Sequence, residues 1–115
     1  MSLDPVVTIP DHYRVLFENE RVRVLEYEDS PGDATTSHRH PDSVMVTLSS
    51  FGRRLVHGDQ ERDVEMPAGR ASWLPAQSHR GVNTGSTGPH AILVELKEPT
   101  STPGGTQPAD IGPVG

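Results

Sequence analysis

The sequence predicts an all-β domain built as an antiparallel sandwich or barrel. Short runs of β-branched and apolar residues recur at intervals of roughly 8 to 12 residues along the chain. Turns separate these runs, and the 115 residues include 11 glycines and 11 prolines. No 11-residue window shows the apolar spacing of an amphipathic helix. We therefore expect many short strands and no long helix.

The N-terminal part opens with a β-branched run at residues 6–9 that lies between two prolines. Because proline is tolerated in strands mainly at sheet edges, we expect residues 1–12 to form an edge strand or an arm that reaches a partner subunit. Two further strands are expected over residues 13–17 and 21–28, on either side of a polar turn.

The next strand is expected over residues 35–40 and ends at Pro41, which cannot donate a hydrogen bond to a neighbouring strand. Residues 43–48 follow as an apolar strand. If the two intervening residues preserve the pleat, one face of this strand shares the inward direction of His40. The residues of that face are Val44, Val46 and Leu48.

The C-terminal half contains a predicted hairpin, with strands at residues 53–57 and 61–66 around a Gly-Asp-Gln turn. The remaining expected strands cover residues 71–74, 79–83 and 90–97. From residue 99 onward almost no residue is apolar, so we expect residues 99–115 to form a flexible tail. The barrel domain is thus predicted over residues 13–98.

Composition narrows the possible functions. The formal charge is −6 and the acidic residues are scattered, which argues against binding to a nucleic-acid backbone. Cysteine is absent, so disulfides and thiolate metal sites are excluded and histidine and carboxylate remain as metal ligands. No apolar stretch approaches the length of a membrane span, and no secretion signal is visible. We expect a cytoplasmic protein with no membrane partner.

Two histidines one residue apart, His38 and His40, point to a metal site. Side chains at positions i and i+2 of a strand lie on the same face, so both imidazoles would point the same way. Imidazole is the commonest metal ligand in proteins. A third imidazole is available at His79, in a Gly- and Pro-containing segment further along the chain.

These two segments resemble the paired motifs of the cupin superfamily, G-x5-H-x-H-x3or4-E-x6-G and G-x5-P-x-G-x2-H-x3-N. The residues that match are Gly32, His38 and His40 in the first motif and Gly69, Pro75, His79 and Asn83 in the second. Val44 stands where the glutamate ligand belongs, and the closing glycine is displaced by one residue to Gly52. In the second motif Gln77 replaces a glycine, and the segment from Pro75 to His79 is one residue short.

The resemblance covers about residues 20–97 and implies a cupin-type double-stranded β-helix, or jelly-roll barrel. It also implies that His38, His40 and His79 bind a divalent transition metal without an acidic fourth ligand. Some cupins that lack this ligand, among them diketone-cleaving and thiol dioxygenases, use three histidines on non-haem iron. Fe(II) is therefore the first expectation, with Ni, Mn and Zn as alternatives.

Five other residues are candidates for the surroundings of the metal or the substrate pocket: Gln77, Val44, Glu26, Glu95 and Trp73. Gln77 could hydrogen-bond a ligating imidazole or a metal-bound water. Glu26 and Glu95 lie in strands whose neighbouring residues are expected to be buried. Each carboxylate either points into the barrel, where it could support or bind the metal, or points outward into solvent. Trp73 either caps the core or stacks on a substrate.

Two classes of function fit these residues. The first is a small metalloenzyme, an Fe(II) dioxygenase acting on a chelating diketone, hydroxyketone or enol, with a metal-dependent isomerase or lyase as a related possibility. The second is a non-catalytic cupin that senses a small molecule or a metal, or serves another enzyme. A homodimer is expected, since Met45 and Thr47 would otherwise be exposed on the outside of the barrel.

Overall fold

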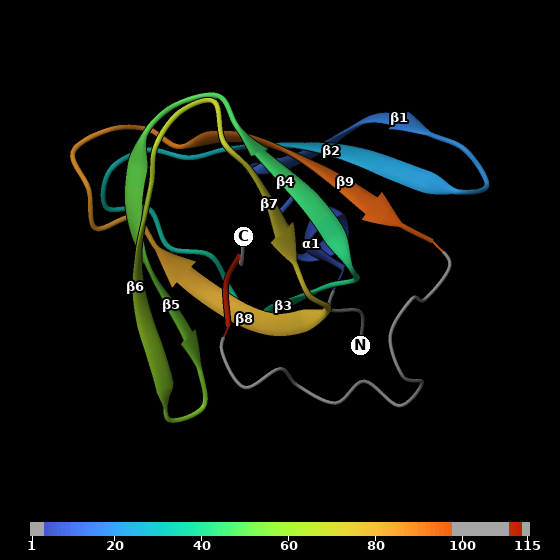
Figure 1. Cartoon of the computed structure of the whole chain (residues 1–115). Helices are drawn as coiled ribbons and strands as arrows, with labels where there is room; N and C mark the ends of the chain where they lie inside the picture. Colours follow the sequence, from blue (N-terminus) through green and yellow to red (C-terminus); the bar gives the residue numbers. More distant parts are fainter. Residues whose placement is uncertain (1–3, 98–110, 114–115) are drawn as a thin grey trace.

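The computed structural model describes residues 4–97 and 111–113, and these form an almost entirely β structure (Figure 1). One short helix, α1 (Pro5–Thr8), precedes the strands. The strands are β1 (Tyr13–Glu18), β2 (Val22–Glu28), β3 (His38–His40), β4 (Ser43–Thr47), β5 (Phe51–His57), β6 (Gln60–Met66), β7 (Ala71–Leu74), β8 (Gln77–Val82) and β9 (His90–Leu96). The all-β prediction is confirmed. Within the described residues, no helix has the length and apolar character needed to cross a membrane.

Two antiparallel sheets enclose a common interior (Figure 1). The larger sheet has the strand order β1-β2-β9-β4-β7, and the smaller has the order β3-β8-β5-β6. Several neighbours within a sheet are far apart in the chain, such as β2 with β9 and β3 with β8. This interleaving is typical of a jelly-roll and not of a simple meander.

The main hydrophobic core fills one part of this interior. Its buried members are Ile9, Tyr13, Leu25, Tyr27, Leu74 and Leu93. These side chains come from β1, β2, β7 and β9 of the larger sheet and from the segment after α1, so the core packs this segment against the inner face of the larger sheet. Burial of apolar surface of this kind is the main contribution to the stability of such a fold.

The N-terminal segment differs from its prediction, because residues 5–8 form helix α1 and not an edge strand or an arm to a partner. The side chain of Asp4 accepts a hydrogen bond from the Val6 backbone N–H (3.0 Å), and Pro5 occupies the first turn. An aspartate N-cap followed by proline is a strong helix start, and here it outweighs the β propensity of two valines. Val6 then packs against the core of its own chain.

The facing of β4 also differs from its prediction. Ser43 and Thr47 are buried and Met45 packs against the core, whereas Leu48, just beyond the strand, is 50% exposed. The expectation that Val44, Val46 and Leu48 line the interior, and that Met45 and Thr47 lie outside, is therefore wrong. The cause is the turn at residues 41–42, where the chain leaves the smaller sheet at β3 and enters the larger sheet at β4. Side chains of a strand alternate between its two faces, so a shift of one residue at this crossing turns every side chain of β4 to the opposite face.

Part of the predicted tail is packed. Ile111 is fully buried and forms a second apolar cluster with Leu55 and Val64. Its carbonyl accepts a hydrogen bond from Arg62 Nη1 (2.8 Å). Residues 111–113 therefore contradict the expectation of a flexible segment, because a single large apolar side chain suffices to dock them. The rest of the predicted tail lies outside the described residues.

Candidate metal centre

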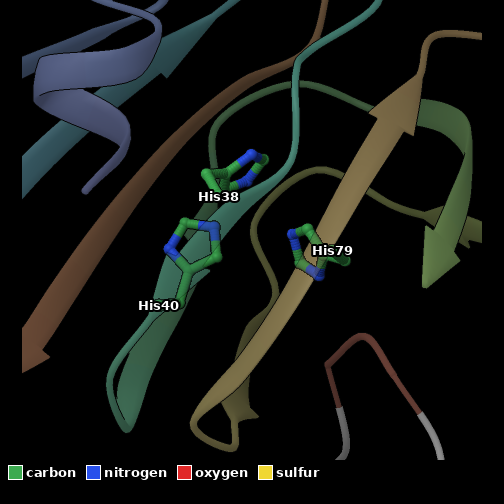
Figure 2. A group of neighbouring side chains, drawn as sticks. All are labelled: His38, His40 and His79. Atoms are coloured by element: carbon green, nitrogen blue, oxygen red, sulfur yellow. The ribbon is translucent and has the colours of Figure 1, made fainter. Parts of the chain in front are cut away.

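The three histidines meet because β3 pairs with β8. In this antiparallel register His38 lies opposite His79, and His40 lies opposite Gln77. Strand alternation turns His38 and His40 to the same side, and β8 brings the third ring to meet them (Figure 2). One nitrogen from each ring lies within 4.8 Å of the others, and all three residues are buried.

Hydrogen bonds fix the orientation of two of these rings. His38 Nδ1 donates to the carbonyl oxygen of Thr36 (2.7 Å), and His79 Nδ1 donates to Gln77 Oε1 (2.8 Å). A carbonyl oxygen only accepts, so the proton of each ring resides on Nδ1 and the lone pair on Nε2. The His38 and His79 rings are thus prepared to bind a metal through Nε2.

The third ring, His40, lies beside a carboxylate, but its Nδ1 has no hydrogen-bond partner among the described residues. Its Nδ1 lies 3.8 Å from Glu95 Oε2, and Glu95 Oε1 is held by the Arg23 guanidinium (2.7 Å). Arg23 also pairs with Asp4, the N-cap of α1 (2.9 Å). The other nitrogen, Nε2, faces the Tyr13 hydroxyl at 3.4 Å, a long and weak contact.

The centre also contains buried polar atoms without a hydrogen-bond partner among the described residues, namely Nε2 of His38, Nδ1 of His40 and Oε2 of Glu95. Such atoms are rare in folded proteins and call for an explanation. A metal ion bound among the three rings would account for His38 Nε2 directly. It would also polarise the His40 ring and strengthen its contact with Glu95.

Burial keeps the three imidazoles neutral. It lowers the pKa of His38 to about 4, with a further contribution from the positive charge of Arg53. Burial likewise holds the pKa values of His40 and His79 well below the ordinary value of 6.5. Neutral imidazole is the form that binds metal, so the site is available to an ion at neutral pH without first losing protons.

Two of the five predicted neighbours lie at the centre, namely Gln77 behind His79 and Glu95 behind His40. Burial raises the pKa of Glu95 above its ordinary range, opposed by the charge of Arg23. Gln77 Oε1 also accepts a hydrogen bond from the Gly112 N–H (2.6 Å), which connects the docked C-terminal residues to the ligand shell.

The structure does not bring the other three, Val44, Trp73 and Glu26, to the histidines. Val44 and Trp73 are paired across β4 and β7 on the face opposite to Met45. Glu26 is bonded to Arg14 and to His90 (2.8 Å) on the outside of the barrel. With Glu28, Glu26 and His90 form a second group whose ligand atoms lie within 4.8 Å of one another, but Arg14 already supplies a cation there.

Met45, not Val44, occupies the inward position that corresponds to the glutamate of the first motif. It lines the same cavity as His40 and His79. The motif allows four residues between the second histidine and the glutamate, which places position 45 there and brings Gly52 to the expected closing position. The one-residue displacement of that glycine was the sequence feature that could have identified Met45.

Two further residues of the interior were missed, Tyr13 and Arg53. Both are buried and line the cavity beside the histidines. Tyr13 also contacts the rings of His38 and His40, each at 5.7 Å between centroids. No motif marks either residue, so only their inward positions on β1 and β5 reveal them.

The cavity itself is largely apolar. Its walls include Tyr27, Leu55, Leu74 and Leu93, while histidine and arginine supply its charged or polar groups. The volume open to water-sized molecules inside it is about 50 Å³. An apolar lining with a few polar groups is typical of sites that bind small organic molecules.

Solved structures of similar shape support the assignment of the fold. A cupin domain from Bordetella pertussis Tohama I is 27% identical, with 75% of this chain and 92% of that chain covered and a TM-score of 0.70. The polyketide cyclase RemF from Streptomyces resistomycificus is 25% identical, with coverage of 77% and 66% and a TM-score of 0.58. An RmlC-like cupin with a double-stranded β-helix fold from Methanocaldococcus jannaschii is 15% identical, with coverage of 73% and 77% and a TM-score of 0.59.

No protein-family model and no curated protein matches the chain. The fold comparison is nevertheless consistent, since proteins of different origin align over about three quarters of this chain. The topology of the two sheets, the histidine pair on β3 and the third histidine on β8 agree with it. The chain has the fold of a small single-domain cupin.

Proposed function

We propose that His38, His40 and His79 hold one divalent transition metal ion, with Fe(II) as the first candidate and Ni, Mn or Zn as alternatives. The observation that carries this proposal is the convergence of three buried rings, since one nitrogen of each lies within 4.8 Å of the others. Nδ1 of His38 and Nδ1 of His79 donate to oxygen acceptors, which leaves their Nε2 lone pairs for an ion, while Nδ1 of His40 lies 3.8 Å from Glu95. Hydrogen-bonded support behind a ligating histidine is typical of metal sites.

The ligand set would give the ion a high positive charge. Imidazole is neutral, and the inward position beside the ligands holds Met45, not a carboxylate. A divalent ion on three imidazoles keeps its formal charge of 2+ and has open coordination positions. Such a centre favours a chelating ligand with negatively charged oxygens.

We further propose an Fe(II) dioxygenase that acts on a small diketone, hydroxyketone or related enol. The metal would supply a redox-active Lewis acid at which the chelated substrate and O2 react. The protein would contribute an apolar enclosure, with Leu74 and Leu93 among its walls, that limits the access of water to the reaction.

Two alternatives use the same centre. A Lewis acid without O2 chemistry would give an isomerase, lyase or cyclase, and one similar structure is that of a polyketide cyclase. A cupin without catalysis would use the cavity to sense a small molecule or a metal. Proteins with this fold have many different activities, so the fold alone does not distinguish a dioxygenase from an isomerase, a lyase or a sensor.

Metal analysis tests the centre. Untagged protein should bind one equivalent of Fe(II), Ni(II) or Zn(II), and replacement of any one of the three histidines by alanine should abolish stoichiometric binding. His90→Ala is the matched control, because His90 belongs to the second, outer group. Loss of metal in His90→Ala with retention in His38→Ala would refute the assignment.

Oxygen uptake tests the reaction. The Fe(II) protein, supplied with a panel of diketones, hydroxyketones and thiols, should consume O2 in an oxygen electrode. Turnover under strict anaerobiosis would favour the isomerase or lyase, and absence of turnover with Fe, Ni, Mn and Zn would favour the sensor.

A further inference from the structure

Tyr13 is a buried residue of the barrel whose hydroxyl group points at the histidine cluster. It is the first residue of β1, lies opposite Tyr27 on β2 and is only 6% exposed. Its backbone N–H donates to the Ile9 carbonyl (3.2 Å), and its ring packs against the Tyr27 ring with 4.6 Å between centroids. The side chain is therefore held in place, and its polar end is directed at one specific position.

The Tyr13 hydroxyl makes a single hydrogen bond within the described residues, a long contact of 3.4 Å with Nε2 of His40. The rings of His38 and His40 lie next to the Tyr13 ring, each with 5.7 Å between centroids. Imidazole rings contain no oxygen acceptor. The hydroxyl of the third neighbouring ring, Tyr27, is used elsewhere, since it accepts a hydrogen bond from Arg53 Nη1 (2.8 Å). Tyr13 thus depends on His40 for its hydrogen bond.

A metal ion on His40 would remove this partner. A ligating imidazole gives the lone pair of one nitrogen to the metal and keeps its proton on the other nitrogen. In His40 the nitrogen beside the carboxylate is Nδ1, 3.8 Å from Glu95 Oε2, so Nε2 is the nitrogen that would hold the ion. Figure 2 shows one nitrogen of the His40 ring turned towards the other two rings. Nε2 would then have neither a lone pair nor a proton for Tyr13.

The released Tyr13 hydroxyl would need a new acceptor, because a buried donor without a partner costs free energy. The cavity that Tyr13 lines is also lined by His40 and His79. A ligand that completes the coordination of an ion at these histidines would therefore share this space with the hydroxyl. The open volume is about 50 Å³, so only a small chemical group fits there.

The donor character of Tyr13 limits the chemistry of this ligand. A carboxylate or enolate oxygen keeps a lone pair after it binds a metal, and can still accept a hydrogen bond. An amine or imidazole nitrogen gives its only lone pair to the metal and cannot accept one. An oxygen anion would pair with the Tyr13 hydroxyl, whereas a nitrogen ligand would leave the hydroxyl unpaired.

We propose that the Tyr13 hydroxyl donates a hydrogen bond to an oxygen atom of the ligand that completes the coordination of the metal. Tyr13 thereby selects oxygen anions over nitrogen ligands. This rests on the proposed metal centre and deepens it, because it identifies a protein group that recognises the chelating oxygen of the substrate.

The first test measures ligand affinity on the Co(II)-loaded protein through its visible absorption. Acetate supplies an oxygen anion, and imidazole supplies a nitrogen ligand without a further acceptor. Tyr13→Phe, which removes only the hydroxyl, should weaken acetate binding by about tenfold or more, the effect expected of a hydrogen bond to a charged group. It should leave imidazole binding unchanged or slightly tighter.

Thr47→Val is the matched control for this test. It removes another fully buried hydroxyl, which donates to the Pro67 carbonyl (2.6 Å) on β4. Acetate binding should be retained in this variant. An equal loss of acetate binding in Thr47→Val and Tyr13→Phe would show that the Tyr13 hydroxyl acts through general stability, and would overturn the proposal.

The second test needs no variant at position 13. The chain has two tyrosines, so protein labelled with ¹³C at tyrosine Cζ gives two NMR signals, which Tyr27→Phe assigns. In the Zn(II) protein, acetate should move the Tyr13 signal downfield in a saturable way, because a hydrogen bond to an anion polarises the O–H group. Imidazole should not cause this downfield shift. A Tyr13 signal that responds alike to both ligands, or to neither, would overturn the proposal. A phenolate signal with Zn(II) alone would also overturn it, since Tyr13 would then be a metal ligand itself.

The outcomes separate the two proposals. Equal acetate affinity in the wild-type protein and Tyr13→Phe, or failure of acetate to bind the wild-type Co(II) protein, would overturn the role of Tyr13 and leave the metal centre standing. Failure of the wild-type protein to bind Co(II) or Zn(II) would refute the metal centre, and the role of Tyr13 with it. If Tyr13→Phe does not fold, the NMR result on the wild-type protein decides.

Discussion

Met45 occupies the position on β4 from which a carboxylate could reach the histidines, so Met45→Glu should convert the centre to four protein ligands. We expect affinity for Zn(II) at neutral pH to rise by about tenfold or more, because an anionic oxygen replaces a thioether beside a divalent ion. Competition with a fluorescent chelator measures the change. Val44→Glu is the matched control and should leave the affinity unchanged, since Val44 lies on the other face. Tighter Zn(II) binding by Val44→Glu but not by Met45→Glu would show that Val44, and not Met45, faces the histidines.

The buried histidines make the stability of the metal-free protein depend on pH. The pKa of His38 is about 4 in the folded chain and 6.5 when unperturbed, so between these values the unfolded chain binds more protons. The free energy of unfolding should therefore fall as the pH is lowered from 6.5 towards 4. Urea titrations in the presence of EDTA measure this, and a His38→Gln variant should show a flatter dependence. A wild-type protein equally stable at pH 7 and pH 5 would contradict the prediction.

The three histidines of the cluster could be predicted from the sequence, but their surroundings could not. His38 and His40 are found by spacing alone, because two residues on one strand need no knowledge of the rest of the fold. Whether Val44 or Met45 faces the interior depends on how the two residues between β3 and β4 cross from one sheet to the other, and the local sequence pattern does not determine this. Arg53 carries no motif, and its burial beside Tyr27, Asp29 and Gly81 follows only from the tertiary structure.

At the scale of elements, β8 carries both a candidate ligand, His79, and the residue that positions it, Gln77. Gln77 Oε1 accepts hydrogen bonds from His79 Nδ1 (2.8 Å) and from the Gly112 N–H (2.6 Å). Gln77→Leu should weaken metal binding by about 10- to 100-fold, the usual effect of removing a partner behind a ligating histidine. Gln77→Glu keeps the acceptor and should retain most of the affinity. Equal loss in both variants would show that Gln77 acts through packing alone.

Helix α1 shows why an element can be mispredicted from composition. Two valines and a threonine favour a strand. In a segment of four residues, however, the capping residue and the proline at the start determine the secondary structure. Asp4 caps the helix and also pairs with Arg23, which holds Glu95 behind His40. The segment is thus linked through Arg23 and Glu95 to the surroundings of the histidine cluster, by contacts that only the tertiary structure creates.

At the scale of the whole molecule, the C-terminal residues close part of the barrel. Ile111 is fully buried against Leu55 and Val64, and Pro113 lines the cavity. Ile111→Ala should lower the free energy of unfolding by about 2 to 5 kcal/mol, and Ile111→Val by about 0.5 to 1.5 kcal/mol. Chemical denaturation measures both. An unchanged stability in Ile111→Ala would show that these residues are not docked in solution.

The outer face of the larger sheet carries an apolar row that crosses all five strands. The strand registers place Phe17, Val24, Val94, Val44 and Trp73 opposite one another in sequence across β1, β2, β9, β4 and β7. Phe17 is 55% exposed, and the other four are only partly buried within the described structure. A continuous apolar face of this kind favours contact with another protein surface.

We expect this row to form the contact of a homodimer, because a face that crosses the whole sheet can pair with itself about a two-fold axis. Light scattering at micromolar concentration should give the mass of two chains. Val44→Glu places a charge at the centre of the row and should shift the protein towards one chain, while Val46→Thr, a milder change on the same face, should not. A wild-type mass of one chain would contradict the dimer. Since the row lies on the outer face of the larger sheet and the histidines lie on β3 and β8 of the smaller sheet, the monomeric variant should still bind one metal ion per chain.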